Sequence, residues 1–189
     1  MVGMAALQGR TVALPVPPED AEPEEPASPW DAVRPVGGTA RVLSTEPGES
    51  LPVHDEVFEV SEASADGLAA PVLPGGVAGP GVLRTDQWAE EFVRGFFGRA
   101  GSTGAASCPG LRPPVEADVV RDRALTSWPS PRTGLRTEQR NADAQRVDRA
   151  VQGSERGPNV LVAGREPDDL PLLDAALVGR FAEATVART

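Results

Sequence analysis

The sequence is poor in several residue types, and each shortage narrows the class of protein. Its 189 residues include one cysteine (Cys108) and one histidine (His54), and no lysine, isoleucine or tyrosine. A single cysteine excludes an internal disulfide framework and a cysteine-rich zinc site, so no metal is expected. The apolar runs fall short of the roughly 18 residues that a membrane span requires. The first ten residues lack the basic and apolar segments of a signal peptide, which predicts a cytoplasmic protein without membrane contact.

The charge balance is acidic, because 28 Asp and Glu residues outnumber 18 arginines and give a formal net charge of −10. Phosphate contacts need clustered cations, so nucleic-acid binding is not expected. The 20 glycines and 20 prolines make up about a fifth of the chain, close to the range of low-complexity sequences. A folded core is therefore expected to be thin.

Short apolar segments alternate with helical patterns along the chain. Strand-like segments cover residues 9–14, 39–44, 57–60, 69–73, 119–120, 124–126 and 160–163. Several of them run into glycine turns, and alternation with helices is typical of an α/β fold with a parallel sheet. Prolines follow the first strand directly, and proline cannot donate a backbone hydrogen bond, so we expect this strand to be the least regular of the set.

Three helices are expected between these strands. The first has Ser28 as its N-cap, and the acidic segment 19–29 before it looks like a solvated loop. A second follows the cap at Thr85-Asp86, and a third runs from Asp168 or Asp169 to about residue 184. One apolar face is predicted to include Trp88 in the second helix, and another to include Leu172 in the third. Residues 132–157 look like a polar surface excursion.

The order of several short motifs resembles the PfpI-type intracellular protease family. These motifs are 72–78 (VLPGGVA), 83–86 (LRTD), 92–97 (FVRGFF), 115–121 (VEADVVR), 125–130 (LTSWPS) and 164–171 (GREPDDLP). The family belongs to the ThiJ/PfpI superfamily of the parkinsonism-associated deglycase, which is also called type 1 glutamine amidotransferase-like. The resemblance implies a flavodoxin-like three-layer sandwich with a mostly parallel central sheet. It places one domain at residues 9–185, between tails at 1–8 and 186–189.

The resemblance also implies a set of site residues. Cys108 matches the family's nucleophile, which stands on a tight turn between a strand and a helix. Glu25 matches the acidic residue that hydrogen-bonds the sulfur, and Glu22 matches a second acidic position. The amides of Gly75, Gly76 and Gly110 match backbone donors that polarise a carbonyl oxygen. Family members commonly form homo-oligomers, so a homo-oligomer is implied too.

The chain departs from the family beside the nucleophile. Protease members have a histidine directly after the cysteine, where this chain has Pro109, and an acidic residue where it has residues 79–81 (GPG). His54 is expected far from Cys108. Pro113 and Pro114 fall where the next helix should continue, and a proline inside a helix costs about 3 kcal/mol. Peptidase activity is therefore not expected.

Two functional hypotheses stay open. In the first, Cys108 and Glu25 give a weak glyoxalase- or deglycase-type activity on a small aldehyde or dicarbonyl, with no cofactor. In the second, the protein is a catalytically silent relative that acts as a stress-related binding or chaperone-like protein. Thiol reactivity near neutral pH discriminates between them.

Overall fold

The computed structural model describes residues 6–17, 22–45, 57–59, 68–76, 78–128, 142–156 and 159–186. The strands are β1 (Thr11–Val16), β2 (Thr39–Ser44), β3 (Val57–Glu59), β4 (Ala70–Leu73), β5 (Thr103–Ser107), β6 (Ala124–Thr126), β7 (Gln145–Val147), β8 (Val151–Arg156) and β9 (Asn159–Gly164). The α-helices are α1 (Glu24–Val33), α2 (Gly79–Leu83), α3 (Gln87–Phe97), α4 (Arg112–Glu116) and α6 (Leu170–Val186), and two 3-10 turns are η1 (Arg34–Val36) and η5 (Pro167–Asp169).

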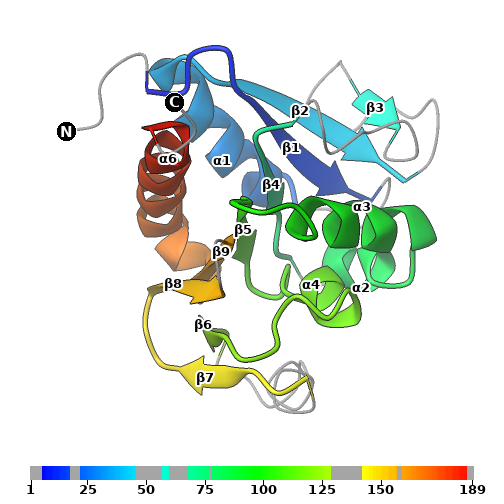
Figure 1. The fold of residues 1–189 in the computed structure, drawn as a ribbon. Helices are drawn as coiled ribbons and strands as arrows, with labels where there is room; N and C mark the ends of the chain where they lie inside the picture. The colour runs from blue at the N-terminus through cyan, green and yellow to red at the C-terminus, as the bar shows by residue number, and fades with distance from the viewer. Residues whose placement is uncertain are drawn as a thin grey trace.

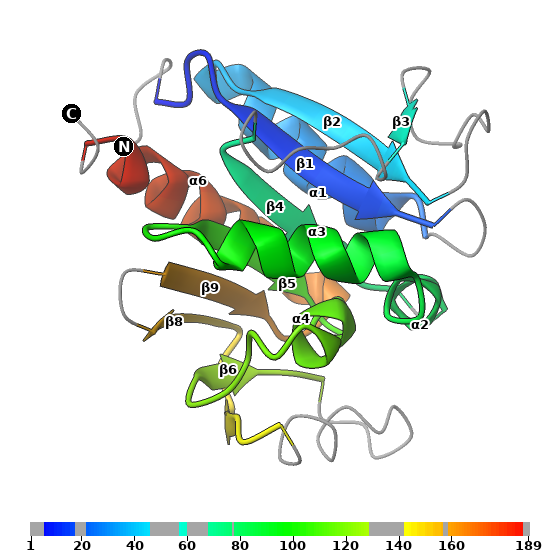
Figure 2. The same ribbon diagram turned by 45° about the vertical axis from the view of Figure 1, so that its right-hand side comes forward.

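A central sheet of seven strands has the order β3-β2-β1-β4-β5-β9-β8. All its neighbours pair in parallel except β8, which runs antiparallel to β9. Helices α1 and α6 cover one face of this sheet, while α2, α3 and α4 cover the other (Figures 1 and 2). The expected flavodoxin-like sandwich with a mostly parallel sheet is confirmed.

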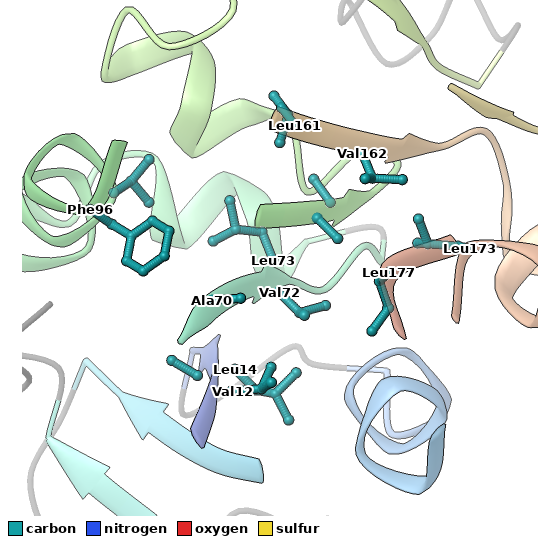
Figure 3. Packing of buried hydrophobic residues seen from close by; sticks show 14 of the residues in the cluster. Val12, Leu14, Ala70, Val72, Leu73, Phe96, Leu161, Val162, Leu173 and Leu177 are labelled. Carbon is teal, nitrogen blue, oxygen red and sulfur yellow. The ribbon is translucent and has the colours of Figure 1, made fainter. Parts of the chain in front are cut away.

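The core lies on both faces of the central strands. Leu73 of β4 points toward Phe96 of α3, whereas Val72 points toward Leu177 of α6 (Figure 3). Successive strand residues face opposite sides, so a strand between two helical layers must be apolar throughout. All four residues of β4 are buried accordingly. Packing begins before the expected domain start, because Leu7 is fully buried and its amide donates to Val36 O at 2.9 Å.

The proline in β1 is tolerated because of the pairing pattern. β1 pairs with β4 only at Val12 and Ala13, whereas it pairs with β2 along its whole length. Pro15 lies beyond the β4 pairing, where β1 has one neighbour and a missing N–H removes no bond on the β4 side. The strand has the same length as the expected segment 9–14 but is shifted by two residues, so that it begins at Thr11 and continues through Val16.

Several local expectations are wrong, and packing explains each. Helix α1 begins at Glu24, inside the segment expected to be a loop, and Ser28 is not its N-cap but donates to Asp174 Oδ2 of α6 at 2.5 Å. Residues 119–120 form no strand, and the expected excursion 132–157 contains β7 and β8. Trp88 and Leu172 are 50% and 57% exposed, because they lie beside the buried faces of α3 and α6.

Helix α3 has the N-cap that its sequence indicates. Asp86 is extended, and its Oδ1 accepts a hydrogen bond from the Ala89 amide at 2.7 Å. The side chain thereby satisfies one of the amides that a helix start leaves without an intrahelical partner. The apolar face behind the cap, which includes Phe92, Val93 and Phe96, is buried against the sheet.

We expect Asp86→Ala to lower the free energy of unfolding by about 1 kcal/mol, because the cap is lost. Asp86→Asn keeps an oxygen acceptor and should lose much less. Urea unfolding followed by circular dichroism measures both variants. Equal losses in the two would contradict a capping role for this side chain.

Candidate functional site

Cys108 stands directly after β5, in the middle of the central sheet and at the carboxyl end of its parallel strands. Its side chain is 2% exposed, and its Sγ accepts a hydrogen bond from the Trp128 amide at 3.0 Å. The peptide bond between Cys108 and Pro109 is cis. In open α/β sheets this edge is the usual place for a site, so the nucleophile position of the sequence analysis falls where chemistry is expected.

The turn around Cys108 differs from a strained nucleophile turn. Among the described residues, the non-glycine positions with positive φ are Asp118, Asp122 and Asp143, and Cys108 is not one of them. Helix α4 begins only at Arg112. Pro113 and Pro114 therefore lie in its first turn, where a missing N–H costs no helical bond, and the expected distortion by these prolines does not occur.

Glu25 reaches the site from helix α1 and is 2% exposed. Its Oε2 accepts a hydrogen bond from the Gly75 amide at 3.1 Å, across the turn that follows β4. Burial raises the pKa of Glu25, while the nearby Ser107 hydroxyl and the hydrogen bond from the Gly75 amide lower it and the charge of Glu22 raises it further. Burial is the largest of these influences, so this carboxyl holds its proton to a higher pH than an exposed glutamate does.

The two glycines after β4 allow the acidic residues to approach. A Cβ at Gly75 would lie 2.7 Å from Cys108 O and 2.9 Å from both Glu25 Oε2 and Ser107 Oγ. Gly76 has φ +99°, and a Cβ there would overlap Oε2 of Glu22. A side chain at either position would displace the groups that form the site.

The backbone donors of the site are largely engaged within the protein. The Gly75 amide donates to Glu25, and the Gly110 amide donates to Ser107 O. Pro109 has no N–H to offer. Among Gly75, Gly76 and Gly110, the amide of Gly76 donates neither to Glu25 nor to Ser107 O.

Burial raises the pKa of the Cys108 thiol to about 11, and the charge of Glu25 raises it too. The Trp128 amide and the charges of Arg112 and Arg146 act in the opposite direction, but they are outweighed by burial. Cys108 is therefore a thiol, not a thiolate, at neutral pH.

Sequence reasoning did not identify Trp128, Arg112 or Arg146 as residues that act on Cys108. Trp128 was expected only to pack, and it acts through its backbone amide, for which the residue type gives no signal. Arg146 lies in the segment expected to be a surface excursion, yet its Nη2 donates to Ser127 O at 3.3 Å, next to Trp128. The chain has eighteen arginines, and nothing in the neighbouring sequence marks Arg112 or Arg146 as the ones whose charges act on Cys108.

The space beside the site is small. A hollow next to Glu22, Glu25 and Gly75 has a volume of about 10 Å³ for water, which is room for one molecule.

His54 lies outside the described residues. Within the described ranges, no group of three or more His, Cys, Asp or Glu residues could hold a metal ion. No helix in that part of the chain is long and apolar enough to cross a membrane.

Comparison with known proteins identifies related folds over nearly the whole chain. The model of the DJ-1/PfpI family matches residues 10–180. Among curated proteins, none matches the chain. A ThiJ/PfpI domain protein from Brachyspira murdochii is 18% identical with a TM-score of 0.77, and the match covers 94% of this chain and 98% of that one. Drosophila melanogaster DJ-1beta is 19% identical with a TM-score of 0.71, over 94% and 96% of the two chains.

A larger protein from Anabaena variabilis, which contains DJ-1/ThiJ/PfpI-like and ferritin-like domains, is 25% identical with a TM-score of 0.76. The match covers 90% of this chain but 49% of that one, so the chain spans about half the length of that relative.

We expect alkylation of native Cys108 by iodoacetamide to be slow at pH 7, where a pKa of about 11 leaves about one thiol in 10,000 ionised. Between pH 7 and pH 10 the rate should rise about tenfold per unit. Mass spectrometry of the intact protein follows the reaction at the single cysteine, with Cys108→Ser as the blank. A rate that is already constant below pH 8 would contradict the raised pKa.

Glu25→Gln should move this pH profile to lower pH, because it removes a negative charge that raises the pKa of Cys108. Glu24→Gln is the matched control, since Glu24 lies in the same helix but is exposed. Identical shifts in the two variants would show that Glu25 does not act on the thiol directly.

Proposed function

Because the chain belongs to the DJ-1/PfpI family, we propose that Cys108 and Glu25 form a thiol–carboxyl pair that acts slowly on small reactive carbonyl compounds, as glyoxalases and deglycases do. The observation that carries the proposal is the burial of both groups around Gly75, so close that the charge of Glu25 raises the pKa of the thiol. A nucleophile beside a carboxyl group is the minimum that this chemistry requires.

The reaction can be written for methylglyoxal with all atoms balanced. Ionised Glu25 takes the thiol proton while Cys108 Sγ bonds to the aldehyde carbon, and the proton passes to the carbonyl oxygen to give a hemithioacetal. Glu25 then moves the C1 proton to C2, and the hydroxyl proton on the C1 oxygen passes to the C2 oxygen, which converts the adduct to a lactoyl thioester. Water hydrolyses the thioester to lactate and frees the thiol. No oxidant or reductant is consumed.

The electrostatics of the site support a slow reaction. A carboxyl group shuttles protons best when its pKa lies near the working pH, and burial moves the pKa of Glu25 in that direction. The thiol is the weak partner, because its own pKa is raised to about 11. Pro109 also removes one backbone donor, and the loss of one donor from an oxyanion site costs on the order of 100-fold in rate.

A second candidate is a catalytically silent binding or chaperone-like protein. It is favoured by the 2% exposure of Cys108 and by the hollow beside Glu25, which has room for one water molecule. A dicarbonyl substrate can reach the sulfur only if the surrounding turns give way. The two candidate functions differ in one measurable respect: only the enzyme needs Cys108 to consume a carbonyl compound.

Peptidase activity is not part of the proposal. Cleavage of a peptide bond needs a group that activates the thiol and protonates the leaving amine, usually a histidine. Within the described residues no imidazole lies near Cys108, and the position after it is Pro109. A homo-oligomer remains a proposal from family resemblance, and sedimentation of the purified protein tests this assembly. A cytoplasmic location remains a proposal from the residue composition.

We expect the wild type to consume methylglyoxal slowly and to form lactate in equal amount, with kcat/KM rising from pH 6 to pH 9. The rise follows from ionisation of Glu25 above its raised pKa and from the growing thiolate fraction of Cys108. Cys108→Ser should abolish the reaction, and Glu25→Gln should lower kcat about 100-fold or more. Enzymatic determination of lactate gives the rates, and Glu24→Gln serves as the control.

Equal rates for the wild type, Cys108→Ser and Glu25→Gln would reject the enzymatic proposal and leave the binding protein. A rate that falls between pH 6 and pH 9 would contradict the assigned roles of the two groups.

We also expect no cleavage of fluorogenic peptides or casein by the wild type at neutral pH. The position after Cys108 is Pro109 and not histidine, and peptide cleavage usually needs an imidazole that activates the thiol and protonates the leaving amine. Robust cleavage that disappears in Cys108→Ser would prove this expectation wrong.

A further inference from the structure

A second hollow lies at the opposite edge of the central sheet from Cys108. It is open to solvent, measures about 270 Å³, and is lined by Arg94, Arg123 and Arg156 together with Asp118 and Asn159. Asn159 begins β9, whose parallel partner β5 ends at Ser107, directly before Cys108, so this hollow and the thiol are separated by the length of the strands. The hollow therefore cannot share a small ligand with the site at Cys108.

Arg123 is the unusual member of this lining, because its side chain is 2% exposed. Its Nε donates to Val119 O at 2.8 Å, and its Nη1 donates to Ser154 O at 2.6 Å and Asn159 O at 3.2 Å. Within the described part of the chain its Nη2 donates to no group, and no carboxylate pairs with the guanidinium. A buried cation held only by neutral carbonyls keeps an uncompensated charge.

The charges around Arg123 do not compensate it. The carboxylate of Asp118 is bound by Arg121 Nε at 3.1 Å, and Arg94 is paired with Glu90 at 2.5 Å. Arg156 is exposed and forms no ion pair with any described residue. Burial and the nearby charge of Arg156 lower the pKa of Arg123 to about 10, which shows that the two cations act on each other.

We propose that this hollow binds a small oxyanion, a carboxylate or a phosphate group, between the guanidinium groups of Arg123 and Arg156. Guanidinium groups present N–H donors in a planar fork that matches the oxygens of both anions, and such charge-assisted bonds are the strong ones. The chain has a net charge of −10, so the neighbouring Arg123 and Arg156, neither of which pairs with a described carboxylate, form a local exception. Asn159 fixes the wall of the hollow, since its Oδ1 accepts from the Ser102 amide and its Nδ2 donates to Phe97 O.

The test is titration of the full chain with sodium phosphate and, separately, sodium acetate at constant ionic strength. Isothermal titration calorimetry gives the affinity, and amide NMR shifts locate the site. We expect saturable binding of at least one anion, with shifts at Gly98, Val119 and Asn159 and none at Gly75. The anion that binds distinguishes a phosphate from a carboxylate ligand.

Arg156→Gln should weaken binding roughly tenfold, since one charge-assisted hydrogen bond is lost. It changes an exposed side chain, so folding should be preserved. Arg34→Gln, which removes the same charge from an exposed arginine elsewhere, should bind as the wild type does. Equal affinities in both variants, or no saturable binding of either anion to the wild type, would overturn the proposal. Neither result depends on Cys108, so the proposed enzymatic function stands or falls separately.

Discussion

The close approach of three chain segments at Gly75 is the constraint on which the site depends. The turn after β4 meets the end of β5 and the first turns of α1 so tightly that a single Cβ would touch Cys108 O, Glu25 Oε2 and Ser107 Oγ within 3 Å. Because there is no side chain at this point, the Gly75 amide can reach the Glu25 carboxylate. The same contact removes both ionisable groups from water, so geometry and electrostatics of the site have one origin.

Burial at this junction sets the chemical character of the pair. It raises the pKa of Glu25, and it raises the pKa of the Cys108 thiol, which has no helix starting directly behind it, to about 11. The charges of Arg112 and Arg146 and the Trp128 amide only partly offset the loss of water. A carboxyl with a raised pKa is thus combined with a thiol that stays protonated at neutral pH.

The sequence predicted those features that depend on local pattern. Residues 39–44 form β2 without a change of boundary, and Asp86 caps α3, because alternation and capping act within a few residues. Glu25 was matched to the site through family resemblance, but its place in a helix was missed because the carboxylates and prolines of segment 19–29 suggested a loop. Trp128 and Arg123 act through contacts with segments distant in the chain, and a backbone amide or a buried arginine leaves no local signal.

The two edges of the sheet carry opposite charge, and this limits what each can bind. At the carboxyl edge Glu22 and Glu25 face the turn at Gly75 and Gly76, so a negatively charged carbonyl compound would be repelled before reaching Cys108. A neutral aldehyde or dicarbonyl meets no such barrier. At the amino edge the uncompensated charges of Arg123 and Arg156 favour anions and exclude cations. If both proposals hold, a small anion and a neutral carbonyl compound bind at different ends of the same sheet, and neither competes with the other for its site.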